Sequence, residues 1–361
     1  MRWPDAWKDP ALLDLLKGTA VDSLLIGPGE ELGPVRVRAQ NEGYQLAAPS
    51  GVAVIKGEWP GVKMARGRNA GAGPTGVPWV NSNGWAVRLA MALRPQTTVW
   101  VDAPPEAGTF IVPDSYLIAI ADSAAYGGRW ILSLDAALAS SLAAGKPDAD
   151  KPWKRILQTA AFFAARKPWS AYAPVANIGV VSDFTGSNEF FSQELLNLLA
   201  RAGAHARPVP PGGSFEGLRA ILYPDAAPPP APLRSRIDAF VKAGGLLITS
   251  EKRPLDDPYL WANDAVVMVS HRYDLVRFWN SGATGSFVAT PPQGGKTLVH
   301  LLFYSMRGPD SATVRVAGRF RQATAVTVEQ PAVAHVESLP QDGGIEIHLP
   351  QVSQYVALEL E

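Results

Sequence analysis

The sequence predicts an α/β protein of three domains, and three observations lead to this prediction. The chain has 361 residues, more than a single domain of roughly 100–200 residues holds. Short apolar β-rich segments alternate with helical patterns over most of the chain, and strands alone follow near its end. We therefore expect a barrel-like α/β domain at 1–172, a flavodoxin-like domain at 173–285 and a small β-sandwich at 286–361.

The composition excludes several classes of protein. Lys and Arg together number 33, as do Asp and Glu, so the formal net charge is 0. Because no excess of positive charge attracts nucleic acid or an anionic membrane, we expect neither as a partner. Hydrophobic residues make up 47% of the chain, which is typical of a folded protein. Since cysteine is absent, disulfides, thiolate metal sites and cysteine nucleophiles are excluded.

The first domain is predicted from alternating strands and helices. We predict strands at 23–26, 52–55, 98–101 and 130–134, and helices at 35–42, 85–93, 115–126 and 153–165. This alternation indicates βα units and a mainly parallel sheet. Asn83 is expected to cap the helix at 85–93, because its side chain can accept hydrogen bonds from the first turn. The segment 61–84 is rich in Gly, Pro and Asn and is predicted to be a functional loop.

The second domain is predicted as an open sheet of about five strands with flavodoxin-like topology. Its strands are expected at 178–183, 205–209, 220–224, 246–250 and 266–270, and its helices at 189–201 and 233–243. Gly244 and Gly245 are expected to end the second helix in a left-handed cap. A single eight-stranded barrel over 1–284 is the alternative, but the strand at 205–209 has no place in it.

The third domain is predicted from short strands separated by turn signals. These strands are expected at 297–304, 312–316, 323–329, 332–337, 345–349 and 355–360. Evenly spaced strands with no helices between them are typical of a β-sandwich.

The order of these parts resembles that of trimer-forming bacterial β-galactosidases. The segments NIGVVSDF, ELLNLLARAGAHARPVP and LRAILYPDAAPPPAPLRSRIDAFVKAGGLLITSE resemble the glutamine-amidotransferase-like domain of those enzymes. In them, this domain follows a (β/α)8 barrel and precedes a small β domain. The segment PDSYLIAIADSAAYGGRWILSLD looks like the last helix and strand of such a barrel. The chain is also similar to uncharacterised glycosidase-like proteins of soil bacteria.

The resemblance implies a shortened, TIM-barrel-like first domain, because a complete (β/α)8 barrel takes about 250 residues. The second domain departs from true amidotransferases, which need a nucleophilic cysteine, so a scaffold or oligomerisation role is expected for it. Leu233, Ile237 and Phe240 could form an apolar helix face for a homo-oligomer, or the same face could pack on its own sheet. The Asn-Glu pair that those galactosidases use for their acid is also absent.

Four acidic residues follow predicted strands, namely Glu58, Asp102, Asp135 and Asp183. In parallel α/β folds the carboxyl ends of strands carry the functional residues. Acidic residues also cap the helices that follow strands, and Asp135 has the sequence context of such a cap. Glu58 and Asp102 are therefore the preferred catalytic candidates.

Glycoside hydrolysis needs two carboxyl groups, of which one donates a proton and the other is ionised. We predict Glu58 as the proton donor, because an apolar neighbour such as Trp59 would raise its pKa. The resemblance places Asp102 where the nucleophile stands, so it is predicted as nucleophile or base. The predicted substrate-binding residues are Trp59, Lys63, Trp79, Asn81, Asn83 and Asp135.

These residues lead to two functional hypotheses. The first is a glycosidase-like enzyme acting on a carbohydrate, and the second is an inactive carbohydrate-binding or structural protein of the same layout. No cofactor is expected, and no metal, because the five histidines show no paired ligand spacing.

The location of the protein is predicted from the same composition. The apolar runs are shorter than the roughly 20 residues of a membrane span, and the sequence begins without a secretory leader. The lack of cysteine and the 11 tryptophans favour a periplasmic or secreted protein over a cytoplasmic one, and both stay open.

Overall fold

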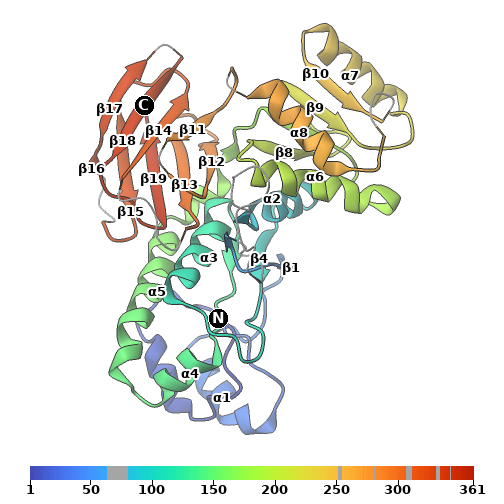
Figure 1. The fold of residues 1–361 in the computed structure, drawn as a ribbon. Helices are drawn as coiled ribbons and strands as arrows, with labels where there is room; N and C mark the ends of the chain where they lie inside the picture. The colour runs from blue at the N-terminus through green and yellow to red at the C-terminus, as the bar shows by residue number, and fades with distance from the viewer. Residues whose placement is uncertain are drawn as a thin grey trace, which may run out of the picture.

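The computed structural model describes residues 1–62, 80–250, 254–270, 272–279, 281–305, 311–330, 334–341 and 343–361. Its larger sheets form three units along the chain (Figure 1). The parallel strands fall into two separate sheets, of three and four strands, so the single barrel over 1–284 is wrong. Among the described residues, no sheet closes into a barrel.

The first sheet consists of β1 (Val52–Lys56), β4 (Thr98–Asp102) and β5 (Arg129–Trp130), all parallel and in the order β1-β4-β5. Further extended segments continue it beyond β5. The Arg2 amide donates to the Leu132 carbonyl at 2.8 Å, and isolated parallel bridges join Arg2 to Leu25 and Ser23 to Gln45. The predicted strand at 23–26 therefore forms single bridges rather than a regular strand. The result is an open parallel sheet with single-bridge extensions.

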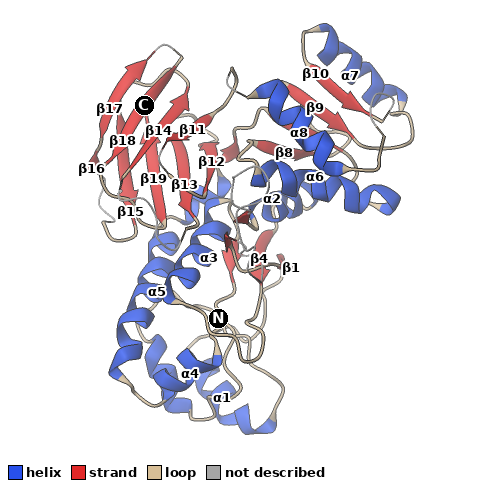
Figure 2. Ribbon diagram, in the orientation of Figure 1, coloured by secondary structure: helices blue, strands red, loops and turns tan. Residues whose placement is uncertain are grey.

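Two helices of this unit contact the sheet, a third packs on one of them, and two lie further from it (Figure 2). They are α1 (Gly33–Asn41), α2 (Gly84–Leu93), α3 (Pro113–Ala125), α4 (Ala136–Ala143) and α5 (Pro147–Ala165). Helix α5 begins earlier than predicted because Pro147 occupies its first turn, where proline is favoured. Trp3 and Trp7 are each 1% exposed and pack edge-to-face at 5.0 Å. These two indoles therefore build core rather than a ligand surface.

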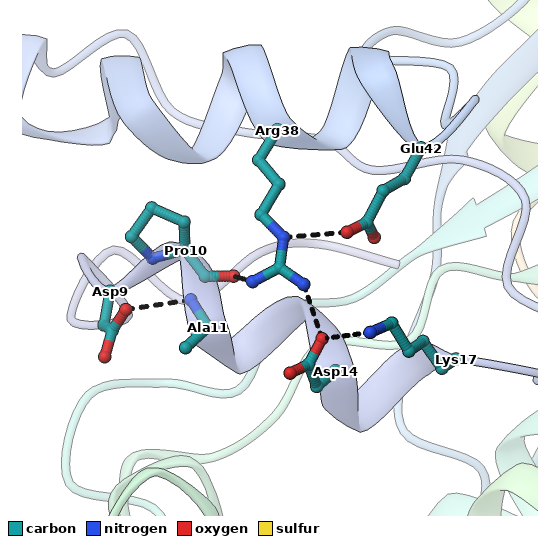
Figure 3. Close-up of polar contacts among 7 residues, drawn as sticks. All are labelled: Asp9, Pro10, Ala11, Asp14, Lys17, Arg38 and Glu42. Atoms are coloured by element: carbon teal, nitrogen blue, oxygen red, sulfur yellow. Dashed lines mark hydrogen bonds and ion pairs between the residues drawn. The ribbon is translucent and has the colours of Figure 1, made fainter.

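Arg38 of α1 forms hydrogen bonds with the short helix at Pro10–Leu16 (Figure 3). Its guanidinium donates to the carboxylates of Asp14 and Glu42 and to the carbonyl of Pro10. Lys17 pairs with Asp14 at 2.8 Å. The two acids raise the pKa of Arg38 by hydrogen bonding, so the cluster stays charged.

The second unit contains β7 (Ile178–Val181), β8 (Ala206–Val209), β9 (Ala220–Tyr223) and β10 (Leu246–Thr249), all parallel. Their order, β10-β9-β7-β8, is the flavodoxin-like order for four strands. Helices α6 (Glu189–Arg201) and α7 (Ala231–Lys242) connect them.

The predicted strand at 266–270 is wrong, because these residues end helix α8 (Pro258–Val269). The Asp257 side chain accepts from the Tyr259 amide at 2.8 Å and caps the helix start. Trp261, Ala265 and Val269 are buried at a spacing of four residues, which is the period of a helix. The sheet accordingly has four strands in the described residues instead of five.

The apolar face of α7 packs on its own sheet. Leu233 is 5% exposed and Ile237 is 4% exposed, and Phe240 packs against the same cluster. This face is therefore covered within one chain and offers no surface to a second copy.

The third unit comprises two antiparallel sheets, in the orders β11-β14-β18-β17 and β16-β15-β19-β13-β12-β6. The bounds are β6 (Ala173–Pro174), β11 (Val276–Trp279), β12 (Thr284–Thr290), β13 (Thr297–Phe303), β14 (Ala312–Ala317), β15 (Ala323–Thr327), β16 (Ala334–His335), β17 (Glu337–Gln341), β18 (Gly344–Leu349) and β19 (Tyr355–Leu360). Both sheets contribute to one buried core, as in a β-sandwich. Strands β11 and β12 begin before residue 286, and β6 pairs with β12. The two sheets therefore include residues that precede the predicted start of the β-sandwich at 286.

Candidate active site

The carboxyl ends of β1 and β4 bring Glu58 and Asp102 to one edge of the first sheet. Lys56 lies directly opposite Asp102, and the Gly57 amide donates to the Asp102 carbonyl at 2.8 Å. Glu58 is exposed, and the Asp102 side chain is 24% exposed. Both carboxyl groups thus lie at the end of the sheet where parallel folds place their functional groups.

Trp59 packs among the aromatic side chains of the first unit. It lies edge-to-face on Trp130 at 5.1 Å and on Tyr116 at 5.2 Å, and Trp130 lies opposite Val101 in the register. Trp59 is therefore part of the core and does not form the apolar wall that we expected beside Glu58.

Asp102 forms an ion pair with Arg2, whose Nη2 lies 2.6 Å from Oδ2. The Arg2 side chain is 40% exposed, so water still reaches the pair. Asp102 Oδ1 and Arg2 Nε are buried and have no hydrogen-bond partner in the described part of the chain. One carboxylate oxygen thus keeps an unused acceptor position.

Asn83 holds the backbone of Glu58 by two hydrogen bonds. Its Oδ1 accepts from the Glu58 amide at 2.9 Å, and its Nδ2 donates to the Glu58 carbonyl at 2.9 Å. The expected capping bond to α2 is absent because the side chain is used here instead. Asn83 is 3% exposed, so it positions Glu58 rather than facing solvent. Gly57 allows this close approach, since a Cβ atom there would overlap Val101 and Asn83.

Asp122 of α3 is a buried carboxyl group that the sequence analysis did not single out. It accepts from the Asn83 amide at 2.8 Å, from Asn83 Nδ2 at 3.2 Å and from the Tyr304 hydroxyl at 2.7 Å. Burial raises the pKa of Asp122, while these hydrogen bonds oppose the rise. A lone acid within the apolar run SYLIAIADSAAY was the signal that could have identified it.

Asn81 and Arg201 lie beside Glu58. Asn81 belongs to β3 (Val80–Asn81), which pairs with β2 (Gly61–Val62). Its Oδ1 accepts from Arg201 Nη2, on α6, at 3.1 Å. Burial lowers the pKa of Arg201, and the charges of Glu194 and Glu58 oppose this shift. The second unit therefore contributes a cation to this edge.

Two predicted substrate-binding residues, Lys63 and Trp79, lie outside the described residues. The strands that flank them, β2 and β3, are paired. The two ends of the predicted loop are thus held together next to Glu58.

Asp135 and Asp183 are not brought to this cluster. Asp135 caps α4, and its Oδ1 accepts from Ala137 and Leu138 at 3.0 and 3.1 Å. The Tyr116 hydroxyl donates to Asp135 Oδ2 at 2.8 Å, and the residue is 1% exposed. Asp183 follows β7 in the other parallel sheet. Asp135 therefore has a capping role in this fold, as its sequence context indicated.

A cavity of about 430 Å³ lies near the opposite edge of the first sheet. Thr98 and Arg129, which begin β4 and β5, line it together with Trp100, Trp130 and Trp169. It does not coincide with Glu58 and Asp102. The described residues contain no group of three His, Asp or Glu side chains placed to hold a metal ion. They also contain no helix with the length and apolar character of a membrane span.

No protein-family model matches the chain, and no curated protein matches it. Among solved structures it is similar to α-L-fucosidase isoenzyme 2 from Paenibacillus thiaminolyticus, with 9% identity and a TM-score of 0.52 over 73% of this chain and 60% of that one. It is also similar to a rhamnosidase from Novosphingobium sp. PP1Y, with 10% identity and a TM-score of 0.50 over 92% of this chain and 38% of the rhamnosidase. A GH42 β-galactosidase from G. stearothermophilus matches with 6% identity and a TM-score of 0.43 over 92% of this chain and 66% of the galactosidase.

The chain spans 60% of the fucosidase and 38% of the rhamnosidase. At such low identity the likeness concerns the fold. The chain therefore has a glycosidase-like fold.

Proposed function

We propose that the protein is a glycoside hydrolase in which Glu58 and Asp102 are the two carboxyl groups. Glu58 donates a proton to the leaving glycosidic oxygen, and Asp102 attacks the anomeric carbon or activates the water that does so. The observation that carries the proposal is that Glu58 and Asp102 stand at the carboxyl ends of the neighbouring parallel strands β1 and β4, whose register ends with Lys56 opposite Asp102. A glycosidase-like fold supports a carbohydrate as the substrate.

The surroundings of the two acids support different tasks for them. Asp102 is bound to the Arg2 guanidinium at 2.6 Å, a partner suited to a charged carboxylate. Glu58 is exposed, and its backbone is fixed by Asn83. A mobile side chain on a fixed backbone can reach a leaving oxygen. Lys63, Trp79 and Asn81 are proposed as sugar-binding residues around it.

The domain layout, the oligomeric state and the location belong to the same proposal. We propose the layout of trimer-type β-galactosidases, with domains at 1–172, 173–285 and 286–361. We also propose a homo-oligomer and a periplasmic or secreted location. The packing of α7 on its own sheet requires any oligomer to use another surface.

One observation favours the alternative, an inactive carbohydrate-binding or structural protein. Trp59 packs on Tyr116 and Trp130, so it does not form the apolar wall that commonly adjoins a catalytic acid. A protein that kept the fold and lost its chemistry would have this feature.

A panel of nitrophenyl glycosides distinguishes the two functions. The panel contains α-L-fucoside, α-L-rhamnoside and β-D-galactoside, after the names of the similar structures. We expect turnover of at least one substrate and a loss of kcat/KM of about a thousandfold or more in Asp102→Asn. The loss in Glu58→Gln should be smaller, because a nitrophenolate leaves with little need of protonation.

Asp183→Asn is the matched control, because Asp183 follows a strand of the other parallel sheet. It should keep the activity of the wild type. Sugar binding in calorimetry without turnover, unchanged in Glu58→Gln and Asp102→Asn, would establish the inactive alternative instead.

A further inference from the structure

Arg88, on α2, is a cation without a carboxylate partner in the described part of the chain. Its two hydrogen bonds both come from Nη1 and are long, at 3.6 Å to the Met91 sulfur and 3.5 Å to the Tyr126 carbonyl. The Phe287 ring lies 5.4 Å from its Cζ and gives a weak cation–π contact. A guanidinium carries five N–H donors, so most of them have no good acceptor.

A cavity of about 40 Å³ adjoins Arg88 at the place where the three units meet. Trp85 of α2, His205 beside β8, and Ser286 and Phe287 of β12 line it with Arg88. The first, second and third units thus each contribute residues to its wall. A water molecule needs roughly 10–15 Å³ of such space, so the cavity has room for about three waters or one small ion.

The charge in this cavity is positive. Burial lowers the pKa of Arg88 to about 10, so the guanidinium is still charged at neutral pH. Burial lowers the pKa of His205 to about 4, so this imidazole is neutral there. The His205 Nε2 lies 3.0 Å from the Ser286 Oγ. Arg88 is partly buried, and a nearby anion or ordered water would stabilise its charge there.

We propose that this cavity binds one small monovalent anion, a carboxylate such as acetate or a halide, between Arg88 and Ser286. The guanidinium supplies the charge and the planar donor pair that a carboxylate accepts. With His205 Nε2–H donating to Ser286 Oγ, the Ser286 hydroxyl supplies one further donor. The cavity is too small for a sugar, so this site is separate from the proposed glycosidase site. The anion would join the three units at their common boundary.

Crystals of the wild type soaked in sodium bromide give a direct test. We expect an anomalous bromide peak within hydrogen-bonding distance of the Arg88 guanidinium. A water network in the cavity, with no bromide peak, would overturn the proposal without any need for a variant.

Thermal unfolding with increasing sodium acetate, at constant ionic strength, tests binding in solution. The melting temperature should rise with acetate concentration for the wild type, because a ligand that binds the folded state stabilises it. Arg88→Gln should lose this rise, whereas Arg94→Gln, at the exposed C-cap of the same helix, should keep it. The same acetate dependence in all three proteins would contradict the site. The glycoside panel tests the glycosidase proposal at Glu58 and Asp102, and the acetate series tests the anion site at Arg88. Failure of one proposal can therefore be distinguished from failure of the other.

Discussion

Replacing Asn83 by Ala should destabilise the protein by about 3–5 kcal/mol. The substitution removes both hydrogen bonds to the Glu58 backbone, at 2.9 Å each, and the Nδ2 bond to Asp122 at 3.2 Å. A neutral hydrogen bond contributes about 1 kcal/mol and one to a charged group about 1.5–3 kcal/mol, which gives this sum. The Asn83 main-chain amide still donates to Asp122 and limits the loss.

Urea unfolding followed by tryptophan fluorescence measures this change, with the free energy of unfolding taken from the midpoint and slope of the transition. Asn41→Ala is the control, because Asn41 is exposed at the end of α1; it should change the free energy by less than about 0.5 kcal/mol. A loss below about 1 kcal/mol for Asn83→Ala would refute the reasoning that this side chain holds the Glu58 backbone.

Three further predictions follow from single residues. Asp135→Ala should lower the free energy of unfolding by about 1–2 kcal/mol through loss of the α4 cap, and urea unfolding equal to that of the wild type would contradict this. Burial lowers the pKa of His205 from 6.5 to about 4, so the unfolded chain takes up this proton first and stability falls as the pH drops from 6.5 towards 4. The melting temperature of His205→Asn should therefore fall less steeply over that range, and equal slopes would argue against it. Gly57→Ala should lower kcat on the best glycoside, because its Cβ displaces Asn83 or Val101; unchanged kcat in an assay of the folded variant would show that Gly57 does not position Glu58.

Local patterns predicted most of the elements. The leucines of α6 repeat with the helical period, and its predicted bounds of 189–201 match the structure. The strand prediction for 266–270 was wrong because Val-Val-Met-Val-Ser is rich in β-branched residues, which favour strands. The cap at Asp257 and the helical spacing of buried residues outweigh that local preference.

The site was harder to predict because its contacts are long-range. The positions of Glu58 and Asp102 follow from strand ends, which a sequence reveals. Asn83, Asp122 and Tyr304 meet only after three distant segments have packed together. Trp59 packs on Tyr116 and Trp130, contacts between distant segments that the neighbouring sequence does not reveal.

The proposed mechanism depends on proton donation by Glu58 to a glycosidic oxygen. It is tested most directly by the rates of Glu58→Ala on phenyl and dinitrophenyl glycosides of the preferred sugar. A phenyl leaving group needs protonation, so its hydrolysis should slow by about a hundredfold or more, whereas the dinitrophenyl glycoside should lose little. An equal loss on both substrates, or no loss on either, would contradict the assignment.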